Sequence, residues 1–166
     1  MTLGLSFLKP GISLKVRFAL WFASVGGAGD FPKAPGTVGS LIALFLFLPL
    51  VNQSWLIQLL AVVLVVLLGF WTSFVVGRES GVEDDQRIVI DEVAGMWITL
   101  LFFPFNIWVF VGGFLLFRVL DIVKVFPANY CDEKIEGGYG VMLDDVVSGI
   151  YANVIIRMLF HLSALL

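Results

Sequence analysis

The chain has 166 residues, the size of one domain, and 60% of them are hydrophobic while only 14% are charged. Soluble domains carry about 25% charged residues, so this composition indicates a bilayer environment rather than water. The net charge of −3 and the lack of a basic patch argue against a nucleic-acid partner, and the lone Cys131 excludes an internal disulfide and a multi-cysteine metal site.

Residues 1–25 mix the cations Lys9, Lys15 and Arg17 with apolar and aromatic residues. This pattern predicts an interfacial amphipathic helix whose cations face anionic headgroups. A helix packed within the protein is an equally good interpretation. The apolar stretch is short and runs into Gly26-Gly27 without a clear cleavage site, so we expect it to remain in the mature protein.

Residues 26–40 contain five glycines and two prolines, which predicts a loop with demanding backbone geometry. The loop ends at Thr37 and Ser40, where a long apolar stretch begins. Thr37 is the expected N-cap of the helix that follows. Free backbone N–H groups at such a helix start can bind phosphate.

No charge occurs between Ala34 and Gly77, but the polar segment 49–54 interrupts this run. We therefore predict a hairpin of two helices, near 38–50 and 54–76. A full membrane crossing needs about 20 residues, so the second helix qualifies and the first is short.

A second uncharged run, Val93 to Phe117, breaks at Pro104-Phe105-Asn106. It predicts another hairpin, with helices near 87–103 and 107–124 that reach roughly crossing size with their polar ends. One continuous spanning helix is the competing interpretation. A last helix is expected near 145–162. The predicted fold class is all-α, an integral membrane bundle of about four to five transmembrane or membrane-embedded helices with an N-terminal interfacial helix.

The hairpins place the charges on one side of the membrane. Neither far-side turn contains a charge, and of the ten Lys and Arg residues Arg157 alone falls outside the near-side segments. By the positive-inside rule the near side is cytoplasmic. Nearly every carboxylate lies on this side as well.

Two acidic groups stand where apolar segments begin. Asp84, Asp91 and Glu92 precede the second apolar run, and Asp144-Asp145 precede the last one. Acids in such a position are costly unless they pair or bind a cation. The alternative is that they cap helices and solvate loops, and one aspartate of the second pair could be an N-cap.

The residue types exclude several routes to phosphate-ester chemistry. Cys131 lies in no phosphate-binding loop, His161 is the only histidine, and both an Asp-x-Asp pair after a strand and a Gly-Lys-Thr/Ser motif are missing. An all-carboxylate group remains, which is the ligand set that suits Mg²⁺.

Arg118, Asp121 and Lys124 are spaced so that they lie along one face of a helix. They could hold a phosphate beside a metal ion, or they could form a ladder of salt bridges. In the first case Mg²⁺ would activate water for in-line attack while the two cations offset charge on the phosphate oxygens. The sequence leaves open which carboxylate is the base, and also a covalent aspartyl-phosphate.

Three segments together resemble the bacterial phosphatidylglycerophosphatase A family. They are the loop Gly27–Ser40, the acidic segment of Asp84 and Ile88–Gly95, and the block Phe117–Lys124 followed by Gly137–Asp145 and Gly149. The resemblance implies a helical integral membrane protein that removes the terminal phosphate of phosphatidylglycerophosphate with Mg²⁺. The family usually has proline after the lysine of the third block, where this chain has Val125, and this departure concerns the local backbone.

The hypothesis is a multi-pass enzyme of the bacterial inner membrane whose site faces the cytoplasm and whose substrate is a phospholipid. The alternatives are a lipid headgroup phosphotransferase and a non-enzymatic protein such as a divalent-cation transporter, which would place its acids mid-bilayer. The candidate residues are Asp84, Asp91, Glu92, Asp144 and Asp145 for the metal; Asp91, Glu92, Asp121, Lys124, Asp144 and Asp145 for catalysis; and Thr37, Ser40, Arg118 and Lys124 for the substrate phosphate.

Overall fold

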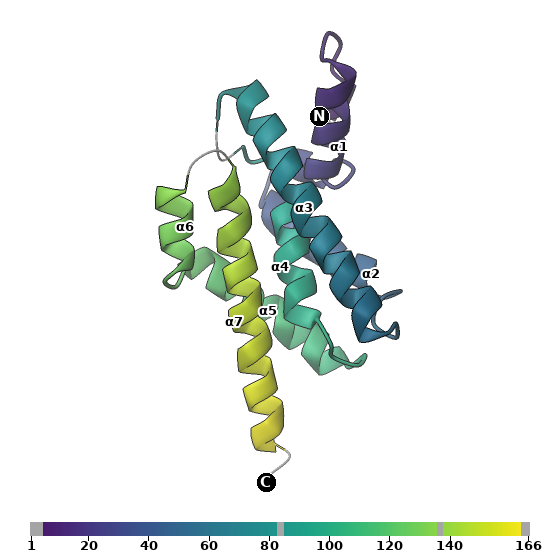
Figure 1. The fold of residues 1–166 in the computed structure, drawn as a ribbon, viewed down its shortest axis with the longest axis vertical. Coiled ribbons are helices and arrows are strands. Elements are labelled where there is room, and N and C mark those ends of the chain that lie inside the picture. The colour runs from purple at the N-terminus through teal and green to yellow at the C-terminus, as the bar shows by residue number, and fades with distance from the viewer. Residues whose placement is uncertain (1–4, 83–84, 136–137, 164–166) are drawn as a thin grey trace.

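The computed structural model describes residues 5–82, 85–135 and 138–163, and within these ranges it contains helices and no strand (Figure 1). The α-helices are α1 (Leu14–Ala23), α2 (Pro35–Phe47), α3 (Trp55–Ser80), α4 (Ile90–Leu100), α5 (Ile107–Val123), α6 (Ala128–Lys134) and α7 (Tyr139–Ser163). Two short 3-10 turns, η1 (Ser6–Leu8) and η2 (Ala28–Asp30), flank α1. The all-α prediction is confirmed.

Both predicted hairpins are present, and capping residues define their turns. The Ser54 hydroxyl accepts a hydrogen bond from the Ile57 N–H at the start of α3. The Asn106 side chain accepts one from the Trp108 N–H at 2.8 Å, which starts α5. The break at residues 104–106 therefore separates two helices, and the interpretation as one continuous helix is wrong.

Contacts along the helices fix their directions. Gly36 of α2 lies beside Glu92 near the start of α4, and the Ala43 carbonyl accepts from the Trp97 side chain further along, so α2 and α4 are parallel. Helix α7 is also parallel to α4, because Gly149 meets Gly95. Helices α3 and α5 run the opposite way. The starts of α2, α4 and α7 and the end of α5 consequently meet at one end of the bundle.

Helix α4 is the central element, and nine of its eleven residues are buried. It packs against α2, α3, α5 and α7 (Figure 1). A Cβ at Gly149 would lie 2.4 Å from the Gly95 carbonyl oxygen, and a Cβ at Gly95 would lie 2.7 Å from the Asp145 carbonyl oxygen. The two glycines therefore let α4 and α7 approach to backbone contact, which brings the acids of both helices together.

Several predicted boundaries are wrong. Helix α2 begins at Pro35 rather than after the loop, because proline is favoured in the first helical position, so Ala34 is the N-cap and Thr37 lies in the first turn. Helix α7 begins at Tyr139 rather than 145, so neither Asp144 nor Asp145 caps it, and Tyr139-Gly140 belong to the helix. Helix α6 was not predicted.

Two of the described helices, Trp55–Ser80 and the segment Tyr139–His161 of α7, are long and apolar enough to cross a membrane. Helix α4 is too short, since eleven residues extend about 16 Å, and here the expected crossing size is wrong. Helix α1 packs within the protein on one side, and its predicted place at the lipid interface stays a prediction. It buries Ala19 and Ala23 in the core and exposes Leu14, Phe18 and Trp21.

Candidate active site

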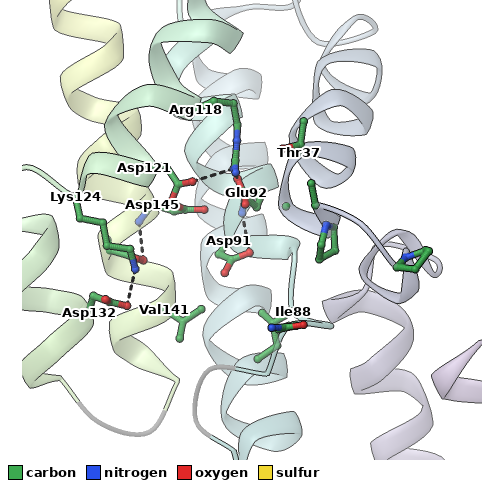
Figure 2. A pocket seen from close by; sticks show the side chains of 16 residues that line it. Thr37, Ile88, Asp91, Glu92, Arg118, Asp121, Lys124, Asp132, Val141 and Asp145 are labelled. Atoms are coloured by element: carbon green, nitrogen blue, oxygen red, sulfur yellow. Dashed lines mark hydrogen bonds and ion pairs between the residues drawn. The ribbon is translucent and has the colours of Figure 1, made fainter.

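A polar cavity of about 440 Å³ opens where the starts of α2, α4 and α7 meet the end of α5 (Figure 2). Its charged lining consists of six carboxylates and two cations, which come from four helices and the turn after α5. They are Asp91, Glu92, Arg118, Asp121, Lys124, Asp132, Asp144 and Asp145. Acids that are far apart in the sequence are thus brought into one cavity.

Three carboxylates form the tightest group. One oxygen each of Glu92, Asp121 and Asp145 lies within 4.8 Å of the others, and Glu92 and Asp145 are buried. Each comes from a different helix, α4, α5 and α7. An all-oxygen group of this size suits a hard divalent cation such as Mg²⁺.

Arg118 holds two members of this group, Glu92 and Asp121, in place. Its Nη1 contacts Glu92 Oε2, and it pairs with Asp121 at 2.9 Å. Ser40 lies behind them and is fully buried. Its hydroxyl donates to Glu92 Oε2 at 2.8 Å and accepts from Arg118 Nη1 at 3.3 Å. Arg118 Nε is buried and has no hydrogen-bond partner among the described residues. The guanidinium therefore retains a donor that its protein neighbours do not use.

Lys124 occupies the other side of the cavity. Its Nζ lies 2.6 Å from Asp132 and 2.8 Å from Asp144 (Figure 2). Burial alone would lower the pKa of Lys124, but the ion pairs with Asp132 and Asp144 outweigh burial and raise that pKa above its usual value. The lysine is therefore charged throughout the physiological pH range.

The first turn of α2 forms the remaining wall. Gly36 and Thr37 line the cavity, and Ala34 adopts a left-handed conformation that turns the chain into the helix. A Cβ at Gly36 would lie 2.0 Å from Glu92 Oε1, so any larger residue there would force the Glu92 carboxylate to move. The unpaired N–H groups and dipole of the helix start favour an anion here.

The structure brings most of the predicted site residues together. Asp91 and Asp144 line the cavity but lie outside the group of three, while Asp121, predicted only as catalytic, belongs to it. Ser40 does not line the cavity, and Asp84 lies outside the described residues.

The sequence interpretation missed Asp132, which comes from the unpredicted helix α6, and Gln86. The run of charges at 132–134 after Pro127 was the available signal for a helix there. Of the salt-bridge ladder considered for Arg118, Asp121 and Lys124, the Arg118–Asp121 pair is present. Lys124 pairs with Asp132 and Asp144 instead of Asp121.

Comparison with known proteins shows which family the chain resembles. Residues 21–160 match the family described as phosphatidylglycerophosphatase A. The chain is 38% identical to phosphatidylglycerophosphatase A of Escherichia coli over 136 residues, covering 81% of this chain and 79% of that protein. It is 39% identical to phosphatidylglycerophosphatase A of Haemophilus influenzae over 154 residues, covering 92% and 90%.

A further relative, from Bacteroides thetaiotaomicron, is named a putative phosphatidylinositol-3-phosphatase. It is 40% identical over 141 residues, covering 80% of this chain and 87% of that protein. No solved structure matches the chain significantly.

Proposed function

This chain belongs to the phosphatidylglycerophosphatase A family, and on that premise we propose that it hydrolyses the terminal phosphomonoester of phosphatidylglycerophosphate to phosphatidylglycerol and inorganic phosphate. The observation that carries the proposal is the cavity itself. It combines a cation-binding group of Glu92, Asp121 and Asp145 with Arg118 and Lys124, which can bind a phosphate dianion.

The residues present fit Mg²⁺. The Glu92–Asp121–Asp145 group offers one carboxylate oxygen from each of three helices, and the excess of acids over cations in the cavity favours a divalent ion. Asp91 and Asp144 line the same cavity outside this group and would interact with the ion through coordinated water. When bound there, Mg²⁺ would supply Lewis acidity and lower the pKa of a coordinated water.

The protein's own groups bind and orient the substrate. Arg118 fixes Glu92 and Asp121 through Nη1, and its guanidinium places a positive charge in the cavity wall that attracts the phosphate. Lys124 contributes a second positive charge, and the start of α2 at Thr37 contributes N–H groups. Ser40 acts behind the cavity wall by keeping the Glu92 carboxylate in place.

A carboxylate of the cavity would accept the proton of the attacking water. Asp91 is buried, lines the cavity and receives only the N–H of Glu92 among its described neighbours, so no cation competes for its proton-accepting oxygen. Asp144 is already held by Lys124. We therefore assign the general-base role to Asp91 and a positioning role to Asp144.

The proposed location is the inner membrane of a bacterium, with the cavity facing the cytoplasm. Helices α3 and α7 are long and apolar enough to cross the bilayer, and nine of the ten Lys and Arg residues fall in the segments predicted to lie on the near side, which supports a cytoplasmic cavity by the positive-inside rule. The acids converge on one cavity at the ends of helices, which favours a catalytic site over a transport path.

Phosphate release from purified protein in micelles tests the proposal. We expect release from phosphatidylglycerophosphate with Mg²⁺, none in excess chelator, and a loss of about 100-fold or more in Asp145→Asn. Glu79→Gln, at the exposed end of α3, is the matched control and should equal the wild type. Full activity in chelator would overturn the metal assignment, and faster release from a phosphoinositide would overturn the substrate.

A further inference from the structure

A tight turn stands at the mouth of the cavity, just before α4. The Ile88 N–H donates to the Asp85 carbonyl at 2.8 Å, which closes a turn with Gln86 and Arg87 at its corner. Gln86 is exposed and lines the cavity, whereas Asp91, Glu92 and Asp145 are buried. Gln86 therefore lies at the entrance, and the buried acids form the floor.

The turn is held rigidly. Arg87 donates to Asp85 from its backbone N–H at 3.1 Å and from Nε at 2.8 Å, and Nη2 completes the pair. Burial raises the pKa of Asp85, but the bonds from Arg87 outweigh burial and lower it, so Asp85 is ionised at physiological pH. The Arg87 carbonyl packs against Gly29, where a Cβ would lie only 2.1 Å from the oxygen.

The Gln86 side chain is exposed and lines the cavity, and it makes no hydrogen bond to another described residue. A primary amide offers both donors and an acceptor without charge. Among the described lining residues, Thr37 and Gln86 are the uncharged polar side chains, and the others are charged or apolar. A neutral group at the entrance to a highly charged cavity suits a hydroxyl better than a phosphate.

We propose that Gln86 is a specificity-determining residue that hydrogen-bonds the secondary hydroxyl of the headgroup glycerol. This inference rests on the proposed function. With the terminal phosphate on the floor of the cavity, the next group toward the lipid is the glycerol that carries it, and its single free hydroxyl passes the entrance. A site that hydrogen-bonds a substrate hydroxyl discriminates against the analogue that lacks it.

The test compares two substrates, each with the wild-type protein and with Gln86→Ala. The substrates are phosphatidylglycerophosphate and its deoxy analogue, in which propanediol replaces the headgroup glycerol. Wild type should prefer the hydroxyl form by roughly 3- to 10-fold in kcat/KM, and Gln86→Ala should lose that preference through a lower kcat/KM for the hydroxyl form. Gln53→Ala, in the far-side turn, is the matched control and should retain it.

Rescue separates recognition from a structural effect. Gln86→Glu keeps an acceptor at the same length and should restore part of the preference, whereas Gln86→Leu, of similar size, should not. A preference that persists in Gln86→Ala, or an equal fall for both substrates, would overturn the inference and leave the proposed function standing. A wild-type protein that hydrolyses neither lipid would overturn the proposed function itself.

Discussion

An alanine at position 36 tests whether the Glu92 carboxylate must stay where the structure places it. The added Cβ would lie 2.0 Å from Glu92 Oε1, and ordinary contact begins at 3.4 Å, so the oxygen must move by about 3.4 − 2.0 = 1.4 Å. Ser40 and Arg118 hold the other oxygen, so the carboxylate cannot rotate freely. Misplacement of a site group by about 1 Å costs about 100-fold in rate.

We therefore expect Gly36→Ala to lower kcat/KM by about 100-fold and to weaken metal binding, measured by Mg²⁺-dependent phosphate release and by metal titration. Gly112→Ala is the control, because a Cβ there meets nothing within 4 Å. It should keep wild-type activity and gain up to about 1 kcal/mol in unfolding free energy from helix propensity. Wild-type kinetics and metal affinity in Gly36→Ala would refute the reasoning.

Three further predictions concern stability, measured by thermal unfolding in detergent. Gly149→Ala should cost at least about 1–3 kcal/mol and lower activity, because its Cβ would lie 2.4 Å from the Gly95 carbonyl oxygen; a stable, active variant would contradict the α4–α7 contact. Asn153→Ala should cost about 1–3 kcal/mol without changing kcat, because the Asn153 amide nitrogen lies 3.0 Å from three carbonyl oxygens at the end of α4 and its two N–H groups donate to them; unchanged stability would remove this role. Asp85→Asn should cost up to about 1 kcal/mol at neutral pH, since the pair with Arg87 is only partly buried. Because the folded pKa of Asp85 is lowered, its contribution is present above the unfolded pKa of about 3.9 and is lost as pH falls through the folded value. A difference between wild type and Asp85→Asn that grows in acid would contradict this sign.

The hairpins were predictable because their signals are local. Ser54 and Asn106 are good N-caps placed between apolar runs, and each does start a helix. The predicted start of α2 was wrong because two signals conflict. Thr37 is a good N-cap, but Pro35, two residues earlier, fixes a helical φ and starts the helix there. Local patterns alone could not decide between them.

Which residues form the site was harder to predict from the sequence. The sequence indicated that the acids gather on one side, but proximity depends on how closely helices pack. Gly95 and Gly149 bring α4 and α7 to backbone contact, and this places Asp145 beside Glu92 and Asp121. Asp132 reaches the cavity on α6, a seven-residue helix that carries little periodic signal.

Titration of purified protein with Mn²⁺, followed by electron paramagnetic resonance, tests most directly whether three helices together hold a divalent cation. We predict saturable binding that Mg²⁺ displaces and that Glu92→Gln, Asp121→Asn and Asp145→Asn each weaken by at least about 10-fold, while Glu79→Gln does not. Binding that is unchanged in all three variants, or absent from the wild type, would contradict the account.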